Sequence, residues 1–161
     1  MVCHFDTSRD LFEAAREAYL DARRCQAQLD AMEARVLSVS GPSLDAHVGG
    51  GEHDRMGARV AAYVDREAEL ESRIDADFRL IDAANAILYG RDGMSDGLAS
   101  LAPAWWADAL YWHYLVAKSW PFVAKMVGYD VHHVQRCARA AFELMDENGM
   151  HNTVDGRGWA E

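Results

Sequence analysis

Residues 119–137, SWPFVAKMVGYDVHHVQRC, predict two helices that meet at a tight corner. Ser119 is a favourable N-cap, and Pro121 would fall in the first turn of a helix, where its missing N–H costs nothing. Gly128 can adopt the left-handed conformation that ends a helix. Asp130 can then cap a second helix, because its negative charge complements the helix dipole.

The two predicted helices, over residues 120–127 and 131–147, each carry one apolar face. The first face consists of Phe122, Val123, Met126 and Val127. The second consists of Val134, Ala138, Ala141 (or Cys137), Leu144 and Met145. Apolar residues that recur every three or four positions lie on one side of a helix. We therefore expect the helices to cross steeply and to share a core of Trp120, Phe122, Val134 and Leu144.

The opposite face of the second predicted helix is polar. Its side chains are those of His132, His133, Gln135, Arg136 and Arg139. Such groups can bind base edges and phosphates, and this is the layout of the recognition helix in a helix-turn-helix. We interpret the first four as contacts to base edges or the groove, and Arg139 as a phosphate contact. Lys118 and Lys125, before and within the first helix, are interpreted as further contacts to the DNA backbone.

Residues 110–144, LYWHYLVAKSWPFVAKMVGYDVHHVQRCARAAFEL, resemble the helix-turn-helix of bacterial sigma factor region 4. They resemble still more the phage regulators of the RinA/ArpU type, which join that module to long N-terminal helices. The family's run is Leu, Arg-Tyr, Ser/Thr-Trp, Ile-Ala, Gly-Tyr-Ser, Val, Arg and Ala-Leu. The matching positions are Leu110, His113-Tyr114, Ser119-Trp120, Val123-Ala124, Gly128-Tyr129-Asp130, Val134, Arg136 and Ala141-Phe142. Upstream, GGGEHDRM and the charged helix after it resemble the family's glycine linker and second helix.

This resemblance implies a sequence-specific DNA-binding regulator encoded by a phage or prophage. Three features depart from the family's pattern. Asp130 replaces Ser at the cap, His113 replaces Arg, and the exposed face of the second helix has only two arginines. Each phosphate contact strengthens binding through counterion release, so these changes lower the expected non-specific affinity for DNA.

Two long helical patterns occupy the N-terminal half. The first steps alternately by four and three through Leu11, Ala15, Ala18, Ala22, Cys25, Leu29, Met32 and Val36, and Thr7 or Ser8 can cap it. The second runs through Val60, Tyr63, Glu67, Leu70, Ile74, Asp77, Ile81, Ala84 and Leu88. Such heptad-like seams need a partner in water. We therefore predict either a helical hairpin or a coiled coil that makes the protein a homo-oligomer.

The organisation that we predict is an all-α fold in three parts, since no strand-like alternation occurs in the sequence. Residues 1–92 form the long-helix region, with a flexible glycine-rich loop over 37–55. Residues 93–147 form the helix-turn-helix domain, which begins with a further helix over about 104–117. Residues 148–161 form a flexible tail.

The composition argues against several classes of protein. No run approaches the about 18 to 20 apolar residues of a membrane span, and no secretory signal is recognisable. The three cysteines lie far apart without a CxxC pair, so we expect neither disulfides nor a zinc ribbon, and a reduced, cytoplasmic protein. His132 and His133 point about 100° apart on a helix and lack a third ligand. With no nucleophile–base constellation either, we expect no enzyme, no metal site and no cofactor.

The charge distribution singles out the region of the corner. The chain carries a formal net charge of −10, but residues 104–145 carry four Lys or Arg and three Asp or Glu, a net charge of +1. The segments on either side are acidic, with −8 over 1–103 and −3 over 146–161. A DNA-binding surface is therefore better placed in the central segment than anywhere else in the sequence.

Three functions remain open from the sequence. The one we favour is a transcriptional regulator that binds double-stranded DNA, with RNA polymerase as a further partner, as for sigma region 4. The second is a phage DNA-packaging subunit of the small-terminase kind, which also joins a helix-turn-helix to oligomerising helices. The third is a helical protein–protein adaptor that no longer binds DNA, which would suit the acidic balance. A ring-shaped oligomer would favour the second function, and failure to bind any DNA at low salt would favour the third.

Overall fold

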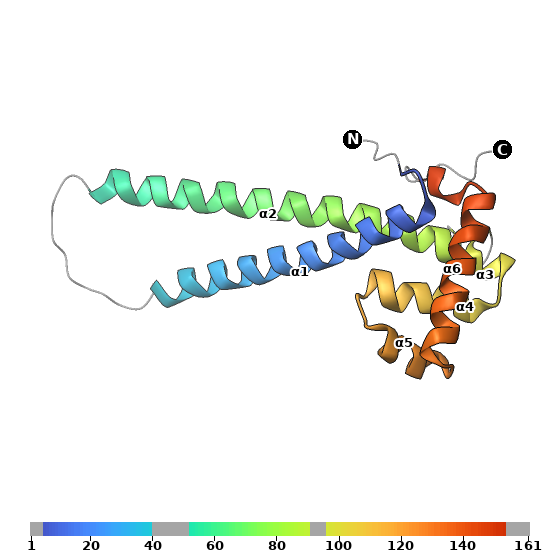
Figure 1. Cartoon of the computed structure of the whole chain (residues 1–161). Coiled ribbons are helices and arrows are strands. Elements are labelled where there is room, and N and C mark those ends of the chain that lie inside the picture. The colour runs from blue at the N-terminus through green and yellow to red at the C-terminus, as the bar shows by residue number, and fades with distance from the viewer. Residues whose placement is uncertain (1–4, 40–51, 91–95, 154–161) are drawn as a thin grey trace. The chain divides into compact units, whose positions relative to one another are not determined.

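The computed structural model describes residues 5–39, 52–90 and 96–153, and every regular element in these ranges is helical (Figure 1). The α-helices are α1 (Ser8–Val39), α2 (Glu52–Tyr89), α3 (Leu98–Leu101), α4 (Ala104–Leu110), α5 (Trp120–Val127) and α6 (Val131–Glu147). A π-helical turn, η1 (Tyr111–Leu115), follows α4, and a 3-10 turn, η2 (Met150–Thr153), follows α6. The predicted all-α fold is confirmed. None of the helices described combines the length and the apolar character that crossing a membrane requires.

Two compact units divide the chain. Unit 1 comprises Met1–Leu20 and Asp77–Glu161, and unit 2 comprises Asp21–Ala76. Unit 1 thus joins the start of α1 and the end of α2 to the helices that the sequence placed in a separate domain from residue 93. The predicted division at residue 92 does not coincide with a boundary between these units.

The core of unit 1 explains this grouping. Leu11 and Phe12 of α1 are fully buried in one cluster with residues of α2, α3, α4 and α6. The Phe12 ring meets the rings of Tyr114 and Phe142 edge-on, at centroid distances of 5.9 and 5.8 Å. Edge-to-face packing is a favoured arrangement of aromatic rings. The first turns of α1 therefore complete a core that the C-terminal helices leave open.

The N-terminus of α1 is held by two sets of hydrogen bonds. Thr7 caps the helix, because its Oγ1 accepts from the Asp10 N–H at 3.2 Å and donates to Asp10 Oδ2 at 2.8 Å. The Ser8 N–H donates to Asp146 Oδ1 of α6 at 2.6 Å. Of the two predicted caps, the side chain of Thr7 is therefore the one used. A carboxylate from the end of α6 satisfies a second free N–H of the first turn.

The segments predicted to be flexible contain more helix than expected. α1 continues to Val39 and α2 begins at Glu52, both inside the predicted loop 37–55; the rest of that loop, 40–51, lies outside the described residues. In the predicted tail, Met150 is 2% exposed and belongs to the core of unit 1. Gly149, with φ 64°, reverses the chain after α6 and returns this apolar side chain to the core. Residues 154–161 lie outside the described residues.

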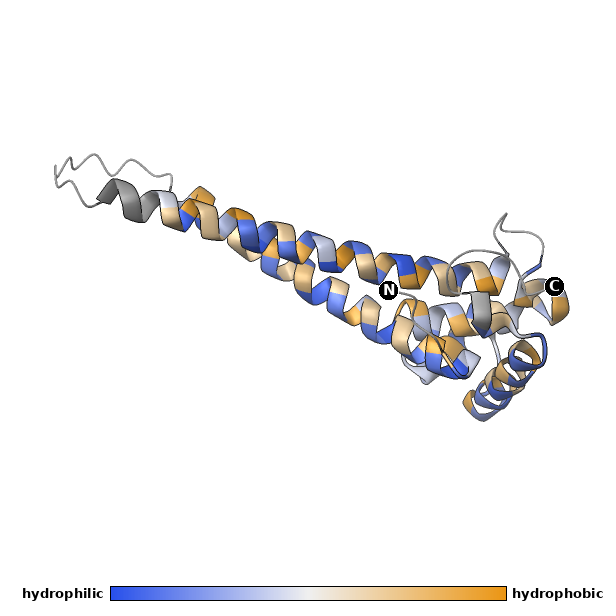
Figure 2. Cartoon of the chain, turned by 90° about the horizontal axis from the view of Figure 1, so that it is seen from above, coloured by the Kyte–Doolittle hydropathy of each residue, from blue (hydrophilic) through white to orange (hydrophobic). Residues whose placement is uncertain are grey.

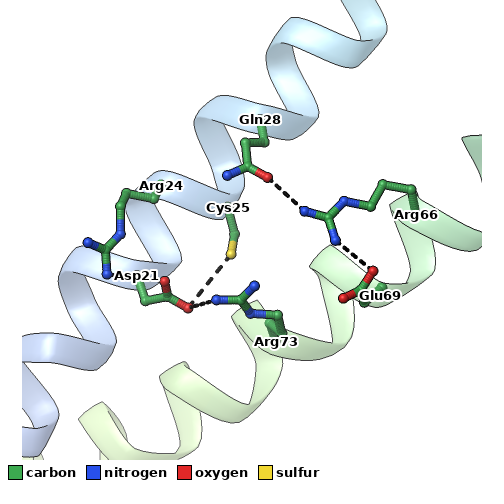
Figure 3. A network of polar contacts seen from close by, with 7 residues as sticks. All are labelled: Asp21, Arg24, Cys25, Gln28, Arg66, Glu69 and Arg73. Carbon is green, nitrogen blue, oxygen red and sulfur yellow. Dashed lines mark hydrogen bonds and ion pairs between the residues drawn. The ribbon is translucent and has the colours of Figure 1, made fainter.

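In unit 2, α1 and α2 lie side by side and antiparallel (Figures 1 and 3). Arg73 Nη2 donates to Asp21 Oδ2 at 2.6 Å, and Arg66 Nη2 donates to Gln28 Oε1 at 3.1 Å. The hydrogen bond from Arg73 is the main reason why the pKa of Asp21 lies below its usual value. The Cys25 thiol, between the two contacts, donates to the same Asp21 carboxylate at 3.8 Å.

The predicted seams are only partly buried in the single chain. Cys25 and Leu70 are buried, but Val36 and Val60, which we expected in the seam, are 49% and 58% exposed. Apolar and polar residues alternate along both helices (Figure 2). The outer ends of the seams are thus about half exposed in the single chain. Homo-oligomerisation through these helices stays a prediction, which light scattering on the full chain would test.

Candidate nucleic-acid interface

The corner between α5 and α6 has the helix-ending glycine and the helix cap that the sequence predicts. Gly128 is left-handed, with φ 80° and ψ 25°, and its N–H donates to the Ala124 carbonyl at 2.9 Å. Asp130 Oδ1 accepts from the His132 N–H at 2.9 Å and so caps α6. Ser119 occupies the N-cap position of α5, but its side chain makes no cap hydrogen bond. The prediction of two separate helices over 120–127 and 131–147 is confirmed.

The core between α5 and α6 differs from the prediction in two members. Val123, Ala124 and Val134 form a buried cluster with Ala109 of α4, and Trp120 packs against it. The predicted members Phe122 and Leu144 do not belong to this cluster: Phe122 is 40% exposed, and Leu144 packs against the other core of unit 1. Each residue turns a helix by about 100°, so burial of positions 123, 124 and 127 turns 122 and 126 outward.

The side of α6 that faces away from the core carries three of the seven predicted DNA-binding residues. Its buried side chains are those of Val134, Ala138, Ala141, Phe142 and Met145. On the opposite side, exposed residues follow one another at three- and four-residue steps, a line that we call the outer stripe: His132, Arg136, Arg139 and Glu143. No described carboxylate forms an ion pair with either arginine of the outer stripe. Both guanidinium groups are therefore available to an external anion.

His133 lies on one flank of the outer stripe rather than on it. Its ring lies 5.8 Å from the Trp105 ring and 5.4 Å from the Tyr129 ring, between centroids. Arg136 Nη2 donates to His133 Nδ1 at 3.1 Å. His133 thus orients Arg136 from an aromatic cluster, a contact that the spacing of the sequence did not predict.

Gln135 lies on the other flank and is half-buried. The remaining predicted contacts, Lys118 and Lys125, are exposed in the turn before α5 and on α5 itself. Lys118 Nζ lies 5.3 Å from the centroid of the Phe122 ring. Among the predicted residues, the structure therefore gathers His132, Arg136 and Arg139 on one stripe. It places the other four beside the stripe, on α5 or in the turn before α5.

The helix predicted over 104–117 ends differently. α4 widens into the π-helical turn η1, and Ala117 has a positive φ of 55°. Inside this turn the His113 ring stacks on Trp120, with centroids 3.8 Å apart and planes at 18°. Its Nδ1–H donates to the Lys118 carbonyl at 2.7 Å, and Arg16 Nη1 of α1 donates to Nε2 at 2.8 Å. Arg16 was not predicted here, because nothing in the sequence pairs residues so far apart.

These contacts require neutral His113. Burial lowers its pKa to about 4, the hydrogen bond to the Lys118 carbonyl opposes that shift, and the charge of Arg16 adds to it. A protonated ring would place an N–H at Nε2 against the Arg16 donor. The stack beneath α5 therefore depends on the charge of a single imidazole.

We predict that this imidazole makes the protein less stable as the pH falls from about 6.5 to about 4. The unfolded chain takes up the proton near pH 6.5 and the folded chain only near pH 4, so protons favour unfolding in this window. We expect His113 to contribute about 2–3 kcal/mol of this loss. This is less than the full pKa shift would give, because solvent screens a ring that is only partly buried. Urea unfolding at several pH values, for the wild type and His113→Gln, measures the difference. Equal pH slopes for the two proteins would contradict this prediction.

Nothing in the described residues offers a competing site for a metal, since no three His, Cys, Asp or Glu side chains are grouped so that they could hold an ion. The surface around α6 instead offers cationic and hydrogen-bonding groups, which suit a polyanion. Comparisons of the chain with protein-family profiles, with functionally characterised proteins and with solved structures found no match.

Proposed function

We propose that this chain is a DNA-binding transcriptional regulator of the phage type that residues 110–144 resemble. The observation that carries the proposal is the outer stripe of α6. It combines two arginines without a described carboxylate partner and a histidine in the first turn of the helix. The helix follows a two-helix corner with a left-handed glycine, which is the arrangement that presents a recognition helix.

The position of each residue along α6 suggests its role on DNA. Residues near the N-terminus of a recognition helix reach base edges, and those further along meet phosphates. His132 and Arg136 are therefore assigned to the floor of the major groove, where an arginine can donate two hydrogen bonds to guanine. Arg139 is assigned to a phosphate. His133 supports the role of Arg136: its ring accepts a hydrogen bond from the Arg136 guanidinium at 3.1 Å, which limits the orientations of that group.

The charge of the protein sets the conditions for binding. The chain is acidic overall, and Glu143 lies on the outer stripe itself. Few phosphates can therefore be neutralised, and non-specific affinity should be low at physiological salt. Binding to a preferred sequence then depends mainly on contacts to bases.

We predict that Arg136→Ala and Arg139→Ala weaken DNA binding in different ways. Loss of Arg136 should cost about 1–3 kcal/mol on the preferred site and little on a scrambled duplex, because a base contact is lost. Loss of Arg139 should weaken both duplexes alike and flatten the salt dependence by about one unit of slope. The site is first selected from a random DNA pool, and fluorescence anisotropy on both duplexes at several salt concentrations then gives the affinities.

Glu143→Gln is the matched control for these substitutions. It changes the charge of the same stripe by one unit in the opposite direction, so affinity for both duplexes should rise modestly. If the three variants fold normally and none of them alters binding to either duplex, α6 is not the DNA-reading helix.

A second candidate function, a protein–protein adaptor, is supported by the outward face of α5. Phe122 and Met126 lie one turn apart there and are 40% and 54% exposed. Aromatic residues and methionine are enriched in protein interfaces. Under this candidate the wild type binds no duplex even at low salt, and Phe122→Ser disrupts a partner complex. DNA binding that is unaffected by Phe122→Ser and lost in Arg136→Ala would count against it.

A further inference from the structure

A small pocket lies beside the outer stripe, between the first turns of α1 and the middle of α6. Its volume is about 190 Å³, and it is lined by Arg9, Gln135, Arg139, Tyr114, Trp120 and Phe142. The first three offer N–H donors and two positive charges, and the last three provide an aromatic floor. Pockets for drug-sized ligands usually measure about 300–1,000 Å³, so this one suits a smaller group.

Arg9 is held at the pocket, and no strong ion pair with a described residue cancels its charge. Its guanidinium carbon lies 5.9 Å from the centroid of the Phe142 ring. It forms an ion pair with the Glu13 carboxylate, with Nε and Oε1 3.6 Å apart, and the two side chains are 54% and 59% exposed. An exposed pair of this kind within one helix is weak and easily replaced. The remaining donors of Arg9 can therefore serve a ligand in the pocket.

We propose that this pocket binds one phosphate-type oxyanion between Arg9 and Arg139, with the Gln135 side chain as a further donor. A guanidinium group is planar, and it can donate two parallel hydrogen bonds at once to two oxygens of a phosphate. The pocket adjoins the outer stripe and shares Arg139 with it. In a complex with DNA the bound group is a backbone phosphate beside the groove that α6 occupies. This identification of the bound group rests on the proposed function. The same chemistry would accept a free phosphate.

The first experiment measures DNA binding by Arg9→Gln, which removes the charge and keeps a side chain over Phe142. We expect three- to tenfold weaker binding to both the selected and the scrambled duplex, and a salt dependence flatter by about one unit of slope. Arg9→Lys should retain the slope, because it keeps the charge. The matched control is Arg79→Gln, an exposed arginine of unit 1 outside the pocket, which should leave the slope unchanged.

The outcomes separate this inference from the proposed function. If Arg136→Ala weakens DNA binding but Arg9→Gln acts no more strongly than Arg79→Gln, the pocket does not hold a DNA phosphate, and DNA binding by α6 stands. If no variant alters DNA binding, the proposed function fails, and inorganic phosphate becomes the deciding probe. Phosphate is then titrated into the full chain while the side-chain NMR signals of Gln135 and the arginines are followed. Saturable shifts that vanish in Arg9→Gln support the pocket as a site for free phosphate, and equal, unsaturable shifts in both proteins overturn it.

Discussion

Phe12→Ala is expected to lower the free energy of unfolding of unit 1 by about 3–5 kcal/mol, the usual cost of removing a fully buried phenylalanine. The side chain is 0% exposed and packs edge-on against Tyr114 and Phe142, so its loss leaves a cavity between α1, η1 and α6. Both rings would also lose an aromatic partner. The expected loss is a large fraction of the stability of a typical domain.

Tryptophan emission during urea unfolding reports on unit 1, because Trp105, Trp106, Trp112 and Trp120 belong to it and the sequence of unit 2 contains no tryptophan. Phe78→Ala is the matched control: Phe78, on α2, also belongs to unit 1 but is 50% exposed, and its loss should cost less than about 1 kcal/mol. Similar losses for the two variants would show that the start of α1 is not part of the core.

Gly97→Ala is expected to destabilise the protein by about 3 kcal/mol, at the upper end of the usual cost of overpacking. A Cβ at this position would lie 2.6 Å from the Leu88 carbonyl oxygen and closer still to the Gly90 nitrogen. These are backbone atoms at the end of α2, which cannot rotate away as a flexible side chain can. The segment that leads into α3 would therefore have to move away from α2.

Gly57→Ala is the opposite case and serves as the control. Gly57 lies in α2, and a Cβ there would have no neighbour within 4 Å. Alanine is the better helix former, so this substitution should raise stability by about 0.5–1 kcal/mol. Thermal unfolding of both variants, monitored by circular dichroism, shows whether each substitution lowers or raises the stability of the protein. A Gly97→Ala protein as stable as the wild type would show that the contact between Gly97 and α2 is not maintained in solution.

The parts of the fold that the sequence predicted well are those with local signals. The helices over 120–127 and 131–147 were placed correctly, because Pro121, Gly128 and Asp130 mark their ends through short-range backbone effects. The prediction that Phe122 lies in the core was wrong, because Phe122 and Val123 are both apolar and only packing decides which of them turns inward.

The parts that were missed depend on contacts between distant residues. Arg16 meets His113, and Arg9 lines a pocket with Arg139, only because the first turns of α1 pack into the core of unit 1. Nothing near Arg9 or Arg16 in the sequence indicates these partners. The candidate site was thus predicted for α6 itself, whose polar face follows from helical periodicity, and not for the part of its surroundings that α1 supplies.

The polar contacts of unit 2 also limit how the paired helices can change in length. Asp21 and Gln28 are seven residues apart on α1, and their partners Arg73 and Arg66 are seven apart on α2. Seven residues complete nearly two helical turns, so both contacts recur on one face. Removing seven residues from each helix would keep every flanking pair opposed, whereas a single-residue insertion in one helix would turn everything beyond it by about 100°. Natural variants of this protein should therefore differ in the length of unit 2 by matched heptads.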